Sequence, residues 1–490
     1  MRVTIERIPE AARQALTRLL ELAGPDRPVW LVGGAVRELL SDRSAADLDL
    51  VVESDALGLG RRLAARLGAA FVVLDPDRGA GRLVDRSGGP ALDLVDFRAP
   101  TLDADLQARD FTVNALAASV RELLRDGQAE IVDPTGGLAD LAAGMVRPCH
   151  ATAIIEDPVR ALRGVRLSLR AGWRLTPAAE DAIAAGAPLV ASVAPERLRD
   201  ELGAILAARQ AAQGLRVLDR LGVLAVLLPE SLPMRETAQP LPHRFDVWEH
   251  SLRTVEGVDA LAADLDELAP WGPGLRAHMA EELGDGLTRR EILKLAALLH
   301  DVSKPETRTL DGARIRFIGH DALGAGRARG IAERLRLARR AGQVVERLVA
   351  EHLRPMHLAQ AGEISRRARF RFFRDLGDEA PDVLLLALAD AAALTGVSPL
   401  AVWEGSGGEV IRALMAGAEV EPAAAAAPPV LRGEDVMQAF GLSPGPEVGR
   451  LLTRAREAQA LGLVATREEA IEHLRRQREV SDATEPRAGT

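Results

Sequence analysis

The chain has 490 residues, of which 47% are hydrophobic and 27% charged, enough for three or four domains with cores of their own. It has no uncharged apolar run of about 18 residues and no basic-then-apolar N-terminus, so we expect no membrane-spanning helix and no secretory leader. The single cysteine, Cys149, excludes an intramolecular disulfide and fits a reducing cytoplasm, while the net charge of −9 argues against general nucleic-acid binding but permits a local basic surface.

The N-terminal part predicts a small α/β domain over residues 1–150. Residues 1–25 predict one amphipathic helix that ends at Gly24-Pro25. From Val29 to about Val132, short β-branched runs alternate with helical segments, which is typical of a small mixed sheet covered by helices.

Two features of this domain suggest phosphate chemistry. Gly33 and Gly34 lie between a predicted strand and a helix, where backbone amides can approach a phosphate, although a plain strand–helix turn is the alternative. Asp47 and Asp49 alternate on the next predicted strand and so share a face, where they could hold Mg²⁺ ions for phosphoryl transfer. The alternative is a solvated strand edge. Asp93 begins a later β-type segment and could supply a third carboxylate.

The segment "ARDFTVNAL" offers a second group of polar residues. Arg109 can meet a triphosphate, Asp110 can accept from a ribose hydroxyl, and Asn114 can brace the turn. Read alone, the same segment is also compatible with an ordinary helix N-terminus.

Alanine-, leucine- and arginine-rich helices follow over residues 151–235. At 100° per residue, five arginines of one predicted helix fall on one face, which would bind phosphates or, alternatively, form salt bridges to another helix. These are Arg160, Arg163, Arg166, Arg170 and Arg174.

A second helical block is expected over residues 240–415, after a proline-containing break. His250, His300, Asp301 and Asp390 are spread along it, and His320 and His352 add two more imidazoles. Any one of these histidines could be structural. An adjacent His-Asp pair on an apolar helix is costly to bury unless a cation or hydrogen bonds pair it, and mixed imidazole and carboxylate ligands suit a transition metal or Mg²⁺.

The C-terminal part begins with the low-complexity linker "EPAAAAAPPV". Residues 430–480 predict a short helical module, for which RNA contact and simple helical packing are the two interpretations. We expect residues 481–490 to be disordered.

Taken in order, the motifs "GGAVRE", "DLD", "RDFTVNAL", "DPTGGLADL", "EDPVRALRGVR" and "ERLRDEL" resemble the bacterial class II tRNA nucleotidyltransferase and poly(A) polymerase family. The resemblance covers residues 29 to about 205 and implies a nucleotidyltransferase head and a helical neck, with Asp47 and Asp49 binding metal and Asp157 and Arg160 reading the incoming base edge. The nucleotide-binding residues it implies are Gly33, Gly34, Arg37, Arg109, Asp110, Asn114, Asp157, Arg160, Arg163 and Arg166, which leaves Arg170 and Arg174 for RNA.

The second helical block resembles the HD superfamily, with "HDVSKP" as its most specific piece. This resemblance implies a helical phosphohydrolase domain with metal ligands His250, His300, Asp301 and Asp390, and Lys304 near phosphate. The metal and the substrate are not readable from it. The tail resembles that of HD-containing tRNA nucleotidyltransferases, which implies contact with the tRNA elbow.

The sequence departs from the family pattern at three places. Glu38 stands where Asp is usual, and Ala108 where a second Arg normally precedes Arg109. Only ten residues, Ala99 to Ala108, separate "DFR" from Arg109, whereas CCA-adding members usually carry a longer loop. A short loop is similar to members that add only two cytidines and leave the A to a separate enzyme, so addition of the terminal A stays open.

The expected function is therefore untemplated addition of C and A to tRNA 3′ ends, from CTP and ATP, with Mg²⁺ in the head and release of pyrophosphate. Three alternatives are a poly(A) polymerase of the same family, a protein that is mainly an HD-type metal phosphohydrolase acting on RNA or nucleotides, and a non-catalytic RNA-binding protein. The short polar C-terminus argues against the first, and two intact metal constellations argue against the last.

Overall fold

The computed structural model describes residues 1–490 except 42, 46, 85–90, 171, 313, 418–426 and 485–490, and only the backbone of 479–484. The chain forms two compact units, Met1–Pro229 and Glu230–Thr490. The boundary falls at the start of the proline-containing break. None of the described helices is long and apolar enough to cross a membrane.

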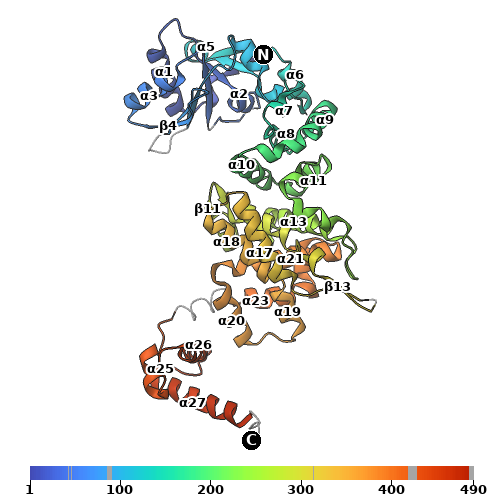
Figure 1. Ribbon diagram of the computed structural model, residues 1–490. Coiled ribbons are helices and arrows are strands. Elements are labelled where there is room, and N and C mark those ends of the chain that lie inside the picture. Colours follow the sequence, from blue (N-terminus) through green and yellow to red (C-terminus); the bar gives the residue numbers. More distant parts are fainter. Residues whose placement is uncertain are drawn as a thin grey trace. The chain divides into compact units, whose positions relative to one another are not determined.

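An eight-stranded mixed sheet forms the head of the first unit (Figure 1). The central strands β3 and β6 are parallel, and the other neighbouring pairs are antiparallel. In spatial order the strands are β1 (Arg2–Thr4), β8 (Gln128–Val132), β7 (Ala117–Ser119), β2 (Trp30–Val32), β3 (Leu48–Val52), β6 (Leu92–Asp96), β5 (Ala80–Val84) and β4 (Ala70–Asp75). The predicted α/β head with a small mixed sheet is confirmed.

Helices complete the core of the head. Leu16 of α1 and Leu59 of α3 are fully buried in one apolar cluster with Leu31 and Leu50 of the sheet. The predicted single helix over 1–25 is wrong at its start, because residues 2–4 form the edge strand β1 and bury Val3 before α1 begins. The head helices are α1 (Glu10–Ala23), α2 (Gly33–Leu40), α3 (Ala56–Leu67), α4 (Leu102–Gln107), α5 (Val120–Asp126) and α6 (Gly137–Ala143).

The neck consists of six helices of the same unit: α7 (Ala153–Glu156), α8 (Arg160–Ser168), α9 (Pro177–Gly186), α10 (Pro195–Leu206), α11 (Ala211–Arg220) and α12 (Val223–Leu227). The prediction of one helix carrying five arginines is wrong, because α8 ends at Ser168. Gly172 turns the chain with φ +77°, and Arg174 then lies on the two-residue strand β10 (Arg174–Leu175), which pairs with β9 (Met145–Val146). Arg170 and Arg174 are therefore not on the helix of the other three.

The second unit is largely helical, as predicted. It also contains two hairpins that were not predicted from the sequence, β11 (Glu282–Gly284) with β12 (Leu287–Thr288), and β13 (Arg308–Asp311) with β14 (Arg314–Phe317). Its main helices are α13 (Val247–Ala263), α14 (Gly272–Met279), α15 (Arg289–Leu299), α16 (Lys304–Thr307), α17 (His320–Arg334), α18 (Arg339–Glu351), α19 (Arg354–Gln360), α20 (Arg366–Leu376), α21 (Ala380–Thr395), α22 (Pro399–Glu404) and α23 (Glu409–Met415).

The end of the chain forms a small helical module with its own core. Helices α25 (Gly433–Phe440), α26 (Pro446–Ala460) and α27 (Arg467–Thr484) bury Val436, Leu451 and Leu474 together. Helix α27 continues to Thr484, residues 485–490 lie outside the described residues, and the predicted disorder of residues 481–490 stays a prediction. Most of the predicted alanine-rich linker also lies outside the described residues.

Candidate functional site

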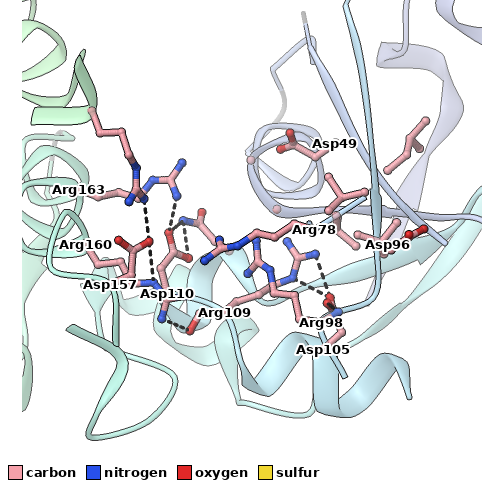
Figure 2. A pocket seen from close by; sticks show the side chains of 18 residues that line it. Asp49, Arg78, Asp96, Arg98, Asp105, Arg109, Asp110, Asp157, Arg160 and Arg163 are labelled. Atoms are coloured by element: carbon pink, nitrogen blue, oxygen red, sulfur yellow. Dashed lines mark hydrogen bonds and ion pairs between the residues drawn. The ribbon is translucent and has the colours of Figure 1, made fainter. Parts of the chain in front are cut away.

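A cavity of about 210 Å³ lies in the first unit where the head meets the neck. Figure 2 shows Asp49, Arg78 and Asp96 on one side of this cleft and Asp157, Arg160 and Arg163 on the other. Head and neck thus contribute charged side chains to one site. Both signs of charge are present, as expected for a pocket that takes an anion together with a cation.

The glycine turn brings backbone close to a carboxylate. β2 ends at Val32, and Gly33 begins α2 with φ +67°, a conformation that L side chains rarely adopt. A Cβ at Gly33 would lie 3.1 Å from Asp49 Oδ2, and the Gly34 N–H donates to the Asp49 carboxylate. Both glycines line the cleft.

The three predicted catalytic carboxylates have different surroundings. Asp49 and Asp93 are directly paired across β3 and β6, and burial together with the Asp93 charge raises the pKa of Asp49. Asp93 does not line the cleft, and Arg82 of β5 donates to both its oxygens at 2.7 Å. Asp47 is exposed immediately before β3 and does not line the cleft either.

The donor set of the head fits Mg²⁺. Carboxylate oxygens are the ligands that this ion prefers, and of the three predicted catalytic carboxylates Asp49 is the one that lines the cleft. Among the described residues, however, Asp47, Asp49 and Asp93 do not converge on one point, and Arg82, Arg109 and Arg163 bring positive charge near these carboxylates. The assignment of Asp47 and Asp49 as metal ligands stays a prediction.

Arg109 and Asp110 both line the cleft from the head. Arg109 donates through Nε and Nη2 to Asp105, at 3.2 and 3.0 Å. Burial alone would raise the pKa of Asp110, but Arg163 at 3.2 Å and the Phe111 N–H at 2.7 Å hold that pKa below its ordinary value. Asp110 is therefore an ionised acceptor at neutral pH.

Asn114 connects Asp110 with Arg37. The Asn114 amide donates to both oxygens of Asp110, at 3.3 and 3.4 Å, and its carbonyl oxygen accepts from Arg37. The predicted bracing role of Asn114 matches these contacts. Arg37 does not line the cleft, and it also donates to Glu38 at 3.2 Å.

The predicted base-reading pair lies at the start of α8. Asp157 and Arg160 both line the cleft, with 3.9 Å between the Arg160 Nε and an Asp157 oxygen. Arg197 of α10 donates to the same Asp157 oxygen at 2.8 Å. The buried Arg160 donates to backbone carbonyls, including that of Ala153 at 3.1 Å.

The remaining arginines of the predicted stripe are mostly paired with acids. Arg163 lines the cleft, whereas Arg166 donates to Glu201 of α10 at 2.7 Å. Arg170 donates to Glu38 at 2.6 Å, and Arg174 is exposed. For Arg166, the salt bridge to another helix is therefore the interpretation that the contacts support, rather than phosphate binding.

Five charged residues of the cleft were not singled out as site residues from the sequence: Arg78, Asp96, Arg98, Asp105 and Arg197. Arg98 ends the motif "DFR" and Arg197 lies in "ERLRDEL", so both were within quoted motifs. Asp96 begins the same motif "DFR". Arg78 and Asp105 carry no local signal, because only the fold brings them to the cleft.

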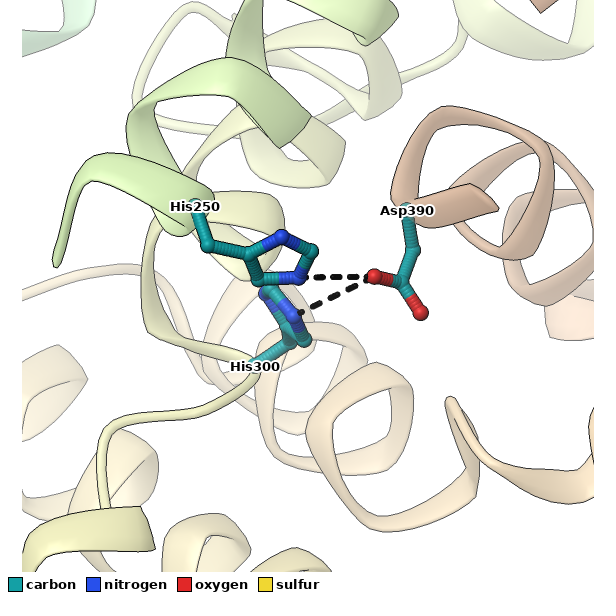
Figure 3. Close-up of side chains that lie close together, drawn as sticks. All are labelled: His250, His300 and Asp390. Atoms are coloured by element: carbon teal, nitrogen blue, oxygen red, sulfur yellow. Dashed lines mark ion pairs between the residues drawn. The ribbon is translucent and has the colours of Figure 1, made fainter. Parts of the chain in front are cut away.

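A second cluster of ionisable side chains lies in the second unit. Figure 3 shows His250 and His300 converging on one oxygen of Asp390, at 2.8 and 3.8 Å from their Nε2 atoms. Asp301 lies beside them, with Oδ2 3.1 Å from His300 Nε2 and 2.6 Å from Lys304 Nζ. The four predicted HD residues are thus brought together.

His320 and His352 complete the cluster on the other side of Asp301. Their Nε2 atoms lie 3.2 and 3.7 Å from Asp301 Oδ1. The ring nitrogens Nδ1 of His300, His320 and His352 each lie 2.7–2.8 Å from the carbonyl three residues earlier, which leaves Nε2 facing the aspartates. This is how metal-binding histidines are usually oriented.

Buried atoms of this cluster lack other partners. Within the described part of the chain, His250 Nε2, His300 Nε2 and both oxygens of Asp301 are buried without a well-directed hydrogen bond. Two groups, His250–His300–Asp390 and Asp301–His320–His352, each bring three potential ligand atoms within 4.8 Å. The donor set fits one or two divalent metal ions of the imidazole-binding class, whose identity the side chains do not specify.

Three protein families match the sequence. Residues 85–147 match the family described as "Poly A polymerase head domain", 172–234 match "Probable RNA and SrmB- binding site of polymerase A", and 247–394 match "HD domain". The matches cover parts of the head, the neck and the second unit.

Several characterised proteins are similar over nearly the whole chain. The A-adding tRNA nucleotidyltransferase of Deinococcus radiodurans is 36% identical over 453 residues, which is 91% of this chain and 94% of that one. The CC-adding tRNA nucleotidyltransferase of Thermus thermophilus is 37% identical over 90% and 91%. The CC-adding enzyme of Geobacter sulfurreducens is 32% identical over 91% of each.

Solved structures share the fold. The Thermotoga maritima CCA-adding enzyme complexed with tRNA has a TM-score of 0.59, 19% identity, and coverage of 96% of this chain and 97% of that one. A CCA-adding enzyme in complex with CTP has a TM-score of 0.63, 19% identity and full coverage of both chains.

Proposed function

Because the chain belongs to the class II tRNA nucleotidyltransferase family, with a poly(A) polymerase head and an HD domain, we propose that it adds cytidines from CTP to tRNA 3′ ends and stops after the second. That the chain is a tRNA nucleotidyltransferase follows from its similarity to these relatives. The stop after the second cytidine is inferred from the linker before Arg109.

The observation that supports nucleotidyl transfer is the composition of the cleft. One cavity brings the Gly33–Gly34 turn and Asp49 of the head together with Arg109, Asp110 and the arginines of α8. Backbone amides and guanidinium groups stabilise a triphosphate, and an ionised Asp110 can accept a hydrogen bond from a ribose hydroxyl.

In the proposed reaction, the tRNA 3′-hydroxyl attacks the α-phosphate of CTP in line, a new phosphodiester bond forms, and pyrophosphate leaves. Mg²⁺ held by Asp47 and Asp49 would offset the charge of the phosphates and lower the pKa of the hydroxyl. Arg109 and Arg163 orient the triphosphate. Asp157 and Arg160 select the base through one acceptor and one donor that fit the Watson–Crick edge of C or A.

The short linker supports the stop after two cytidines. Residues Ala99–Ala108 do not form a loop here, because Leu102–Gln107 are helical and Leu106 is fully buried. Switching from C to A requires the base site to change shape, and a buried helical linker opposes such a change. A-adding and CC-adding relatives are both similar to this chain, so overall sequence identity does not distinguish the two specificities. The stop after two cytidines is therefore inferred from the linker.

The test is pyrophosphate release from each of the four nucleoside triphosphates, with tRNA that lacks CCA and with tRNA that ends in CC. We expect release from CTP with the first tRNA and none from ATP with the second. Asp49→Asn should abolish it, whereas Asp126→Asn, at an exposed helix end, should not. Release from ATP with the CC-ending tRNA would overturn the proposed stop, and no release at all would overturn nucleotidyl transfer.

We also propose a metal-dependent phosphohydrolase activity for the HD cluster, because two groups of three potential ligands lie side by side, with 3.1 Å between His300 Nε2 of the first and Asp301 Oδ2 of the second. The bound metal would activate water and polarise a phosphoester. Measuring metal content and hydrolysis of p-nitrophenyl phosphate with Mg²⁺, Mn²⁺, Co²⁺ or Ni²⁺ tests this. His300→Ala should lose both metal and hydrolysis, and a protein that binds none of these ions would contradict the assignment.

A further inference from the structure

The linker between β6 and Arg109 is built around one buried carboxylate. Thr101 caps α4 through its hydroxyl, which accepts from the Ala104 N–H at 3.3 Å. Leu106 packs into an apolar cluster with Val32 and Val51 of the sheet. Asp105 lies next to Leu106 on the same helix and is also fully buried.

Asp105 joins the two ends of this linker. Its Oδ1 accepts from the backbone N–H of Arg98 at 2.8 Å, at the start of the linker. Its Oδ2 accepts from Nε and Nη2 of Arg109, at 3.2 and 3.0 Å, just after the linker ends. One carboxylate thus closes the segment into a fixed unit.

The same contact orients Arg109. A guanidinium group donates in a rigid planar fork, so fixing Nε and Nη2 also fixes Nη1. Nη1 makes no contact with Asp105 and lies on the cleft side, 3.6 Å from where a Cβ of Gly33 would be. Nη1 therefore points to the place where the glycine turn would meet a phosphate.

Asp105 also keeps Arg109 away from a competing acid. A Cβ at Gly33 would lie 3.1 Å from Asp49 Oδ2 and 3.6 Å from Arg109 Nη1, so both side chains approach the same point of the glycine turn. A buried guanidinium without a carboxylate partner is costly, and Asp49 is an alternative acceptor beside it. Without Asp105, Arg109 would pair with the carboxylate that the reaction needs.

We propose that Asp105 is a positioning residue for nucleotidyl transfer. It aims Arg109 Nη1 at the triphosphate, leaves Asp49 free, and fixes the linker so that the nucleotide site keeps one shape. This inference rests on the proposed function, since it names the residue that prepares Arg109 for the same substrate.

The first test compares Asp105→Asn with Asp103→Asn, an exposed aspartate on the same helix. We expect kcat/KM for CTP to fall by roughly 100-fold in Asp105→Asn, the usual scale for misplacing a binding group by about 1 Å. Asp103→Asn should behave as the wild type. Calorimetric titration with CTP, without tRNA, should show the same weakening.

A double-mutant cycle separates positioning from a general effect on the fold. If Asp105 acts through Arg109, Asp105→Asn should cause no further loss in an Arg109→Ala background. Multiplicative losses would overturn the proposal. If Asp105→Asn alone does not fold, Arg109→Gln is compared with the double variant Arg109→Gln/Asp105→Asn, which buries no unpaired charge, and a further loss in the double variant would overturn the proposal.

A readout without activity tests the fixed linker. Trypsin should cut after the exposed Arg98 faster in Asp105→Asn than in the wild type or Asp103→Asn, because the Arg98 N–H loses its charged acceptor. Equal cleavage rates would overturn the linker part. If the wild type adds no CMP to tRNA, the proposed function fails. If the wild type adds CMP and the Asp105→Asn variant adds it equally well, only the role of Asp105 is contradicted.

Discussion

At the scale of single residues, the two members of the base-reading pair are held very differently. Arg160 is buried, and its guanidinium donates to the carbonyls of Ala153, Arg109 and Ala108 at 3.1–3.5 Å, which fixes its direction. Asp157 accepts one side-chain hydrogen bond, from Arg197 at 2.8 Å, and the same oxygen lies 3.9 Å from Arg160 Nε. Asp157 is therefore the member whose substitution should change base selection with the least damage to the fold.

Asp157→Asn replaces a charged acceptor with an amide that also donates. We expect kcat/KM for CTP to fall by roughly 10- to 100-fold, the value of one hydrogen bond to a charged group. The preference over UTP should narrow as well, because the new amide can donate to an acceptor. Single-turnover incorporation with each triphosphate measures both effects. The exposed Asp181→Asn is the matched control, and an unchanged CTP/UTP ratio would contradict the assignment.

The single cysteine should be almost inert in the folded protein. Burial, and then the charge of Asp110, raise the pKa of Cys149 to about 12. At pH 8 the thiol is therefore protonated, whereas an unfolded cysteine with a pKa of about 8.5 is partly thiolate. Iodoacetamide should label the native protein roughly a thousandfold more slowly than the denatured one. Similar rates would show that Cys149 is not enclosed beside the cleft.

Site residues with a local pattern could be predicted, and those set by strand register could not. Gly33, Gly34, Asp49, Asp110 and Arg160 belong to recognisable motifs and line the cleft. Arg82 was missed because it meets Asp93 only through the pairing of β5 with β6. Arg170 was assigned to RNA, since nothing in the sequence showed that Glu38 would take its charge.

At the scale of elements, α8 is positioned by a glycine. Gly164 faces Phe111, and a Cβ there would lie 2.6 Å from the Phe111 ring and 3.3 Å from Ile183. Phe111 is fully buried and follows Asp110 directly, so this contact sets the distance between the neck helix and the head residues of the cleft.

Gly164→Ala should therefore destabilise the first unit by about 1–3 kcal/mol, despite the better helix propensity of alanine. The KM for CTP should also rise in this variant. Thermal unfolding with and without CTP measures both. Gly326→Ala, in α17 with open space around it, should instead be neutral or stabilise by up to about 1 kcal/mol. Equal behaviour of the two variants would contradict the packing argument.

The ends of elements were harder to predict than their existence. The periodicity of α8 indicated a helix, but its continuation to Arg174 was wrong because Gly172 turns the chain at positive φ. Residues 99–108 were predicted only to be a short connection. The helix within them could not be predicted, because it buries Leu106 and Asp105, and Leu106 packs against residues of the sheet that are distant in sequence.

At the scale of the whole molecule, the nucleotide cleft and the HD cluster lie in different compact units. We expect Asp49→Asn to abolish CMP addition and leave hydrolysis of p-nitrophenyl phosphate unchanged, and His300→Ala to do the reverse. Both activities measured on the same preparations test this. Loss of both activities in a folded Asp49→Asn variant would contradict two separate sites.

Binding of tRNA should depend strongly on salt although the chain is net acidic. If about three phosphates are contacted, the Kd should rise roughly tenfold for a threefold increase in salt concentration. Filter binding at several salt concentrations measures the slope. A flat response would argue against binding through exposed arginines such as Arg174.

The most direct test is extension of a tRNA transcript that lacks CCA, resolved to single nucleotides, with Mg²⁺ and both CTP and ATP. The cleft and the fixed linker predict a product exactly two nucleotides longer, both of them C, that is not extended further. Products three nucleotides long would contradict the stop after two cytidines, and an unextended transcript would contradict nucleotidyl transfer in this cleft.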